Sequence, residues 1–213
     1  MYASPEEMHE DALAILHELI ADAIAAGAGY VQLDFPRYVH LLDEAPRQAL
    51  ARAGVDADEF LERCIDADRR VIDGFPLEVT FGLHLCRGNF RSPWLFGGSL
   101  EPVAERIFNE LPYDVFLIEW EDVEREGDYS PLRHVPPGPI VALGAVSSKV
   151  GALESEPAVV AALEQAARHL DIDQLAISTQ CGFASEAQRN RLSEDEQWRK
   201  LELVGAVAAR VWG

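Results

Sequence analysis

The sequence of 213 residues contains only three cysteines and two methionines, and it has 18 basic residues against 37 acidic ones. An odd number of cysteines does not make a disulfide framework, so Cys64, Cys86 and Cys181 favour a reducing compartment. There, cysteine more often serves as a metal ligand or a catalytic group. The net charge of −19 argues against general binding to nucleic acids or anionic membranes, because their phosphate groups repel an acidic surface.

Long apolar runs are missing as well. No run reaches the roughly 18 residues that a membrane span requires, and the first residues lack the basic and apolar regions of a signal peptide. We therefore expect a cytoplasmic protein. Hydrophobic residues nevertheless make up 48% of the chain, which is typical of a globular protein. The length suits one large domain, which we expect to span residues 1–213.

Short, mostly apolar runs alternate with helical patterns along the chain. We expect strands at residues 30–34, 78–84, 114–119, 139–144 and 174–178. The spacing of apolar residues predicts helices near residues 5–26, 44–72 (broken at Gly54), 100–109, 157–170 and 194–211. Strands that are apolar throughout are typical of a parallel sheet that is covered on both faces. The pattern therefore predicts an α/β fold with five parallel strands.

Polar residues follow each expected strand at the point where it ends. They are Asp34, His84 and Cys86, Glu119, Ser147, Ser148 and Lys149, and Cys181. Because the carboxyl ends of parallel strands open towards the same rim, these side chains are expected to lie close together. The rim is therefore the expected position of the functional site.

The residue types at this rim are those that zinc prefers. His84 and Cys86 are two residues apart, so an extended backbone turns both side chains to one face. This pair alone is a weak signal, and a core histidine beside a buried cysteine is the more common explanation for it. Glu119 and Cys181 at equivalent rim positions favour the metal, because imidazole, thiolates and a carboxylate together suit zinc.

Four separated motifs carry a resemblance to a known family. They are YVQLD (30–34), HLCRGN (84–89), LIE (117–119) and TQCGF (179–183). In this order and spacing the sequence resembles the catalytic C-terminal domain of the cobalamin-independent methionine synthase family. It is most similar to the shorter, single-barrel relatives, which share VSSK (146–149), QCGFAS (180–185) and EDEQW (194–198).

The resemblance implies a (β/α)₈ barrel that moves a methyl group from a reduced folate to the thiol of homocysteine, giving methionine. It implies zinc as the cofactor, with His84, Cys86, Glu119 and Cys181 as ligands. It also implies that Asp34 holds the amino group of the substrate. The physical logic is that zinc keeps the substrate thiol as a thiolate near neutral pH, while the leaving amine needs an acid.

The chain departs from the family pattern in the loop after the fourth strand. The large enzymes place a histidine acid there, whereas this chain has Ser147, Ser148 and Lys149. These three residues are candidates for donor or acceptor contacts, with Lys149 also a catalytic candidate, although a plain loop role explains them as well. Arg87 and Asn89 are candidates for substrate contacts. Because of this loop, another methyl donor, such as a methylated corrinoid protein or a different folate form, stays open. The acidic residue that often follows the substrate aspartate is Phe35 here, so a different substrate pocket stays open as well.

A closed barrel needs eight strands, and the sequence predicts five. We therefore expect a partial barrel that lacks its N-terminal strands and is completed by another chain, either a separate N-terminal half or a second copy. Two other functions stay open. One is a non-catalytic metal-binding subunit of a split barrel, and the other is an alkyl or thiol transferase that acts on another substrate such as an epoxide.

Overall fold

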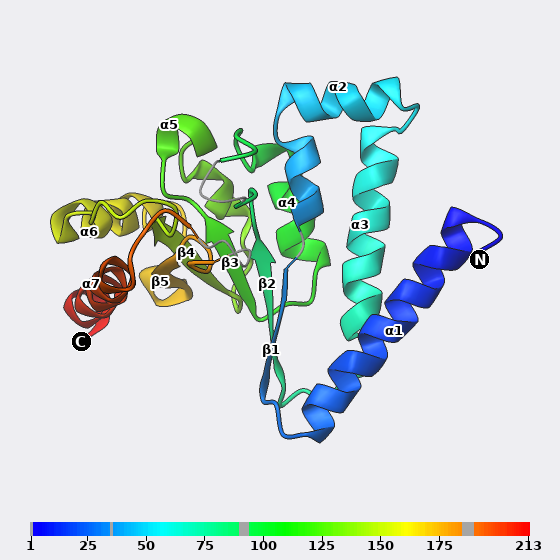
Figure 1. Ribbon diagram of the computed structural model, residues 1–213, viewed down its shortest axis with the longest axis horizontal. Coiled ribbons are helices and arrows are strands. Elements are labelled where there is room, and N and C mark those ends of the chain that lie inside the picture. The colour runs from blue at the N-terminus through cyan, green and yellow to red at the C-terminus, as the bar shows by residue number, and fades with distance from the viewer. Residues whose placement is uncertain (1, 35, 90–93, 185–189) are drawn as a thin grey trace.

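The computed structural model describes residues 2–34, 36–89, 94–184 and 190–213. Within these residues five parallel strands form one sheet in the order β1-β2-β3-β4-β5. Neighbours in the sheet are thus neighbours in the sequence, as in a (β/α) barrel, but β1 and β5 remain at opposite edges (Figure 1). The expected α/β fold, a parallel sheet that does not close, is confirmed.

The strands lie within one or two residues of their expected positions. They are β1 (Tyr30–Asp34), β2 (Thr80–Leu85), β3 (Val115–Glu119), β4 (Ile140–Val146) and β5 (Leu175–Thr179). The start of β2 is shifted by two residues, because Val79 donates its backbone N–H to Pro76 in a turn before the ladder begins. At the carboxyl ends, where the site was expected, the strand ends differ by at most two residues.

The helices also match the sequence pattern. The long ones are α1 (Pro5–Ala25), α2 (Glu44–Arg52), α3 (Ala57–Ile72), α4 (Glu101–Glu110), α6 (Glu156–Ala166) and α7 (Glu194–Trp212). The break expected at Gly54 separates α2 from α3, because Gly54 has a positive φ of 75°. The sequence did not predict the short elements η1 (Pro36–Leu41), α5 (Val123–Glu126), η2 (Ser130–His134) and η3 (Ile172–Gln174). No described helix is long and apolar enough to span a membrane.

The N-terminal caps of the first and the last helix differ. At α7 the Ser193 side chain accepts from the Glu196 N–H, and the Glu196 carboxylate accepts from the Ser193 N–H, so the box is complete. At α1 the Ser4 side chain accepts from the Glu7 N–H, but the Glu7 carboxylate accepts from Ala3 instead. The first helix therefore has a cap but only half of the reciprocal arrangement.

The register of the strands places the core row and the first two site residues on opposite faces of the sheet. One row across the sheet consists of apolar residues that pair laterally and belong to the core or pack against it: Leu33, Leu83, Phe116, Val141 and Leu175. The next row lies on the opposite face and begins with Asp34 and His84. Helices α3, α4 and α6 contribute Ile65, Val103 and Leu163 to the same core as the first row. The row that begins with Asp34 and His84 continues with Leu117, Ala142 and Ala176, so only its members in β1 and β2 are polar. It lies on the face of the sheet opposite to the one that these helices cover.

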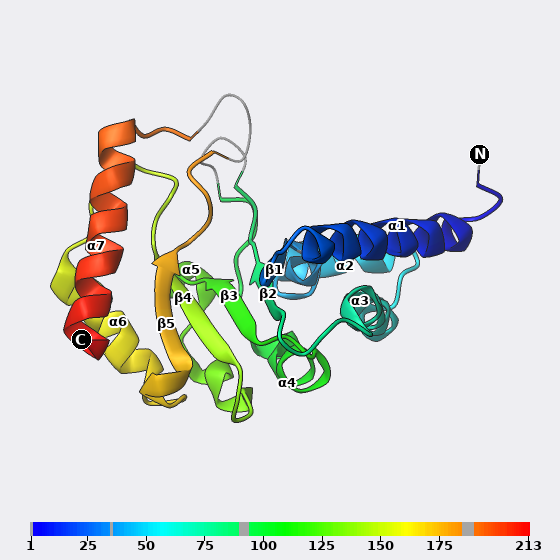
Figure 2. The same ribbon diagram turned by 90° about the horizontal axis from the view of Figure 1, so that it is seen from below.

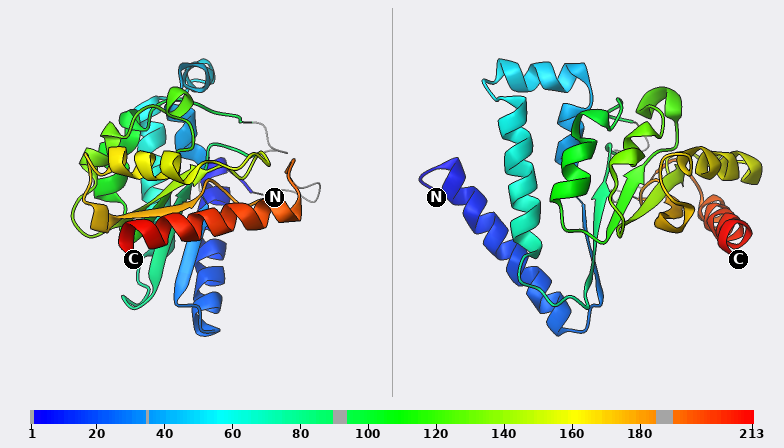
Figure 3. Two further views of the ribbon diagram at one scale, coloured as in Figure 1. Left: turned by 90° about the vertical axis from the view of Figure 1, so that its left-hand side faces the viewer. Right: turned by 180° about the vertical axis from the view of Figure 1, so that it is seen from behind.

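The helices are distributed unevenly around the sheet. Helices α6 and α7 lie beside β4 and β5, whereas α1 to α3 lie beyond β1 (Figure 1). Figure 2 shows α1 extending away from the sheet, with the N-terminus at its far end, and the two termini lie on opposite sides of the molecule in Figure 3. Helix α1 packs against α3, yet its other side exposes a group of apolar side chains: Met8, Ile15, Leu16 and Leu19.

Candidate metal centre

Three of the expected zinc ligands lie together at the carboxyl ends of β2 and β5. The ligand atoms of His84, Cys86 and Cys181 lie within 4.8 Å of one another. The two sulfur atoms are 3.5 Å apart, and His84 Nε2 is 3.8 Å from Cys181 Sγ. His84 and Cys86 are buried and Cys181 is half-buried. The structure therefore joins residues that lie almost a hundred positions apart in the sequence.

Local backbone structure accounts for this convergence. His84 belongs to the extended β2, and Cys86 follows the strand by one residue, so the intervening Leu85 points to the opposite face and is buried in the core. Cys181 follows β5, where the Gln180 backbone N–H donates to Val146 O at the end of β4. The Gln180 side chain donates to Cys181 Sγ at 2.9 Å. Sheet pairing thus holds both thiols at one rim.

The donor set fits zinc in chemistry and in size. One imidazole and two thiols are ligands that zinc takes in both structural and catalytic sites. A tetrahedral zinc ion with Zn–S bonds of about 2.3 Å and a Zn–N bond of about 2.0 Å has edges of about 3.5 to 3.8 Å between ligand atoms. The observed sulfur–sulfur distance of 3.5 Å and sulfur–nitrogen distance of 3.8 Å each lie within about 0.3 Å of the corresponding edge. The three residues present would leave further positions for other ligands.

The two thiols have opposite pKa shifts because they share one hydrogen bond. The contact with Cys181 lowers the pKa of Cys86, and the Gly88 N–H, 3.3 Å from Cys86 Sγ, lowers it further. The same contact with Cys86 raises the pKa of Cys181, and burial adds to this rise. The shared contact therefore favours the loss of one proton from the pair, and an ionised thiol is the form that a metal binds.

Asp34 contacts a ligand of this group. Its Oδ1 lies 3.3 Å from His84 Nδ1, because Asp34 and His84 are paired in register across β1 and β2. Burial alone lowers the pKa of His84, but the contact with Asp34, together with Cys86 and the Gln180 carbonyl, raises it above its ordinary value. The Asp34 side chain remains 57% exposed, so solvent and ligands reach it.

Glu119, the fourth expected ligand, lies outside the group of three. Its carboxylate accepts from Lys149 Nζ at 2.7 Å and from the Arg87 backbone N–H at 2.9 Å. Both Glu119 and Lys149 are fully buried. The structure therefore places the catalytic candidate Lys149 against Glu119, and the assignment of Glu119 to zinc stays a prediction.

A second group of carboxylates includes Glu119, and basic side chains already balance its charge. Glu119, Glu121 and Glu126 have carboxylate oxygens within 4.8 Å of one another. Arg125 pairs with Glu121 at 3.2 Å and with Glu126 at 2.7 Å, while Lys149 pairs with Glu119. Because three cations from Lys149, Arg125 and the nearby Arg87 balance three carboxylates, the structure gives no reason to assign a metal ion there.

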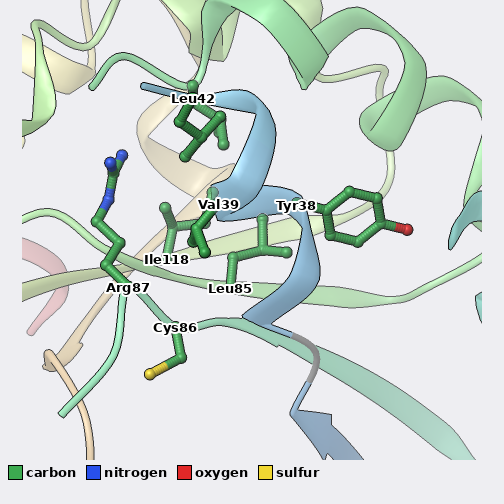
Figure 4. A pocket seen from close by; sticks show the side chains of 8 residues that line it. Tyr38, Val39, Leu42, Leu85, Cys86, Arg87 and Ile118 are labelled. Atoms are coloured by element: carbon green, nitrogen blue, oxygen red, sulfur yellow. The ribbon is translucent and has the colours of Figure 1, made fainter. Parts of the chain in front are cut away.

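Arg87 points away from the thiols. Figure 4 shows the side chains of Cys86 and Arg87 on opposite sides of the chain. The Arg87 side chain is buried, donates to Gly98 O at 2.5 Å and lines a cavity of about 10 Å³ with Tyr38, Leu42 and Ile118. That volume is about the size of one water molecule. Asn89 stays closer to the metal group, because it donates to Gly182 O, next to Cys181.

The two serines of the loop after β4 are bonded within the protein. Ser148 Oγ donates to the Gln180 side chain at 2.8 Å, and Ser147 Oγ accepts from the Lys149 backbone N–H at 3.2 Å. Both serines are buried. These bonds shape the loop that carries Lys149, and the predicted contacts of both serines with substrate stay predictions.

Trp94 and Gln180 also lie around the site, and of these two only Gln180 belongs to a motif quoted above. The Trp94 ring lies 4.7 Å from the Arg125 guanidinium and 5.3 Å from Lys149 Nζ, and its indole N–H donates to Glu121. Gln180 contacts both Cys181 and Ser148. The position of Gln180 directly before Cys181 was the one available sequence signal. Phe35 and Ser185, which sequence analysis mentioned, lie outside the described residues.

A much larger cavity lies at the other end of the sheet. It has a volume of about 520 Å³ and is bordered by the end of α3, the loop before β2 and the start of β3, including Arg70, Phe75, Leu77 and Asp114. These residues precede their strands, whereas the metal ligands follow theirs. In parallel α/β folds the ligand site lies at the carboxyl ends, so we assign the site by its chemistry rather than by cavity size.

Comparison with known sequences gives two relatives in Bacillus subtilis. YxjG is 37% identical over 187 residues, which are 87% of this chain and 49% of YxjG. YxjH is 34% identical over 213 residues, which are 100% of this chain and 56% of YxjH. Both are uncharacterised proteins, and no protein-family model matches the sequence. The chain thus spans about half the length of the curated relatives it matches.

Solved structures with a similar fold include two of the B12-independent methionine synthase type. A protein of Listeria monocytogenes, provisionally assigned as a vitamin-B12-independent methionine synthase, has a TM-score of 0.75 and 28% identity over 98% of this chain and 56% of its own. A B12-independent methionine synthase from a Shewanella species, solved with selenomethionine, has a TM-score of 0.75 and 23% identity over 99% of this chain and 56% of its own. The second likeness supports the fold alone.

Proposed function

We propose that this chain carries the thiol-activating site of a zinc-dependent methyltransferase. The acceptor is a thiol of the homocysteine type, the donor is a folate-type methyl compound, and the product is methionine. The observation that carries the proposal is the convergence of His84, Cys86 and Cys181 within 4.8 Å at the carboxyl ends of parallel strands. The Listeria monocytogenes structure of similar fold, provisionally assigned as a methionine synthase, supports it.

His84, Cys86 and Cys181 would hold the zinc ion, with Glu119 as the fourth ligand. A bound zinc ion supplies the charge that keeps a substrate thiol ionised near neutral pH. Glu119 is buried beside this group with Lys149 as its counter-ion. Lys149 therefore acts through Glu119, because it balances the carboxylate that would otherwise be buried without a partner.

Asp34 is the group best placed to bind the substrate. Its carboxylate is on the same face of the sheet as His84 and is more than half exposed, so it can accept a hydrogen bond from a substrate ammonium group. A charged donor makes such a bond stronger than a neutral one. Asn89 borders the same group of ligands, whereas Arg87, Ser147 and Ser148 are buried and support the loops that frame the site.

We further propose that the open sheet is completed by a segment that the relatives contain and that has no counterpart in this chain. About 44% of YxjH has no counterpart in this chain, since the match covers 56% of it. The exposed apolar side of α1 and the edge strand β1 both face away from the rest of the described chain. Additional strands at these edges would cover apolar surface and unpaired backbone groups at once.

The test has two stages. The first measures the zinc content of the purified chain after reconstitution, for the wild type, Cys86→Ser, Cys181→Ser and Cys64→Ser. The last is a matched control, because Cys64 is buried in the core on α3 rather than at the rim. We expect about one zinc ion per wild-type chain, none in the first two variants and normal binding in the control. A wild-type chain that binds no zinc contradicts the proposal.

The second stage measures methyl transfer from 5-methyltetrahydrofolate to homocysteine, with the chain alone and with the part of YxjH that has no counterpart in it. Turnover that depends on Cys86 supports the proposed reaction. Zinc binding without turnover in either mixture contradicts the enzymatic proposal and favours a non-catalytic metal-binding subunit. Turnover with a thiol and an epoxide in place of homocysteine and the folate favours the alternative transferase.

A further inference from the structure

The position of His84 between two acceptors leads to a further assignment. Its Nδ1 lies 3.3 Å from the Asp34 carboxylate, and its Nε2 lies 3.2 Å from the Gln180 carbonyl oxygen and 3.8 Å from Cys181 Sγ. Each ring nitrogen therefore has an acceptor beside it. The question for metal binding is which nitrogen keeps its hydrogen, because the other one must offer a lone pair.

We infer that Asp34 is a positioning residue for the metal ligand His84, and that it fixes Nε2 as the nitrogen that binds the metal. The inference rests on the proposed zinc site and adds a role for Asp34 beside its proposed contact with the substrate. An ionised carboxylate only accepts hydrogen bonds, so it holds the ring hydrogen on Nδ1. The lone pair of the neutral ring is then on Nε2, which faces Cys181.

The competing arrangement has a definite partner. Without Asp34, a hydrogen on Nε2 can donate to the Gln180 carbonyl, which lies at hydrogen-bond distance. That tautomer directs an N–H rather than a lone pair at the thiols, and it must be lost before His84 can bind a metal. Asp34 opposes it, because a charged acceptor holds a hydrogen bond more strongly than a neutral carbonyl does.

The placement of Asp34 is set by the sheet and not by a flexible loop. Asp34 and His84 are partners in the register of β1 and β2, and both point to the same face. A carboxylate also has two oxygens, so one can hold the imidazole while the other remains for a ligand. The exposed side chain of Asp34 agrees with both tasks.

The experiment compares zinc binding by four forms of the chain: wild type, Asp34→Ala, Asp34→Asn and Gln32→Ala. Gln32 is a matched control, since it is exposed on the same face of β1 and contacts Tyr30 rather than His84. Zinc dissociation constants come from competition with a chromophoric chelator. Circular dichroism confirms that each variant is folded. Nitrogen-15 NMR of histidine-labelled, zinc-loaded protein identifies the protonated ring nitrogen.

We expect zinc to bind about 10- to 100-fold more weakly to Asp34→Ala, the range found when a partner of a metal-ligating histidine is removed. Asp34→Asn should fall in between, because its amide oxygen still accepts from Nδ1 but carries no charge. Gln32→Ala should match the wild type. In the zinc-loaded wild type, the hydrogen of His84 should be on Nδ1.

Two results would overturn this assignment while leaving the zinc site intact: equal zinc affinity in the wild type and Asp34→Ala, or a hydrogen on Nε2 of zinc-loaded His84. A wild-type chain without zinc affinity overturns the proposed site and the role of Asp34 together. Weaker zinc binding by Asp34→Ala in a protein without methyl transfer supports the assignment, and only the proposed reaction then fails.

Discussion

The rim of the sheet and the helix α1 depart from the usual distribution of side chains in opposite ways. At the rim, charged and polar groups are buried: Glu119 and Lys149 are inaccessible to solvent, and His84 is only 9% exposed. On α1, apolar groups are exposed: Ile15 is 53% and Leu19 is 59% accessible. Globular proteins normally bury apolar residues and leave charged ones in water, so both regions need an explanation.

The rim and α1 differ in whether the chain itself supplies partners for these unusually placed side chains. Lys149 neutralises Glu119, and Asp34 contacts His84, so the rim is organised within the described residues. The exposed side of α1 has no such internal partner among the described residues, although its other side packs on α3 through Leu13, Ile20 and Ile24. The rim is therefore a prearranged site, and the outer side of α1 is a surface that suits the proposed completing segment.

The largest expected effect tests the buried ion pair at the rim. Lys149→Met leaves Glu119 buried without its cation, and we expect a loss of about 3 to 5 kcal/mol in the free energy of unfolding. Urea denaturation followed by circular dichroism measures it. The double variant Lys149→Met with Glu119→Gln removes both charges and should recover part of this loss. Equal stability of Lys149→Met and wild type would show that the pair does not stabilise the rim.

Two isoleucines of α1 test the contrast between the sides of this helix. Ile20 is 3% exposed, so Ile20→Ala removes buried contacts and should cost about 2 to 5 kcal/mol of stability. Ile15 is on the exposed side, and Ile15→Ala should change the stability of the isolated chain by less than about 0.5 kcal/mol. Thermal or urea unfolding of both variants measures the difference. Similar losses in both would mean that the outer side is covered in solution.

Asp68 on α3 tests a buried charge that lies away from the rim. Burial raises its pKa to about 7, although Tyr38 donates a hydrogen bond to its carboxylate at 2.7 Å. An unfolded aspartate has a pKa of about 3.9, so the folded protein binds more protons between about pH 4 and 7. The stability that Asp68 contributes is therefore complete below about pH 4 and is lost as the pH rises towards 7.

The measurement is the free energy of unfolding against pH for the wild type and Asp68→Asn. The difference between them should change by up to about 1.4 kcal/mol per pH unit within this range and level off above pH 7. The introduced amide does not titrate, so the variant removes this contribution while it keeps a side chain of similar shape. Parallel curves from pH 4 to 7 would contradict a raised pKa for Asp68.

The smallest expected effect compares the caps of the two outer helices. Ser193→Ala breaks the complete capping box of α7 and should cost about 1 kcal/mol. Ser4→Ala removes the single cap bond of α1, whose first turns extend away from the sheet, and should cost less. Unfolding midpoints of both variants measure the ranking. A larger loss for Ser4→Ala would indicate that the start of α1 is docked in solution.

Much of the fold was predictable because it depends on local patterns. Apolar runs bounded by turns located all five strands, and the spacing of apolar residues located the starts of α1 and α7. The short helices were not predictable, since four-residue to six-residue turns such as α5 and η1 have too few residues for a periodic pattern. The candidate site was predictable in part, because ligand-type residues at the ends of parallel strands must share one rim.

The sequence by itself determined the alternation of strands and helices and the chemical types at the rim, because periodicity and residue chemistry are local properties. Only the tertiary structure decided how these side chains pair. Cys86 meets Cys181 across the sheet, Asp34 lies against Nδ1 of His84, and Lys149 is buried against Glu119. Such pairings depend on strand register and on burial. A shift of one residue in the register moves a side chain to the other face of the sheet or into water.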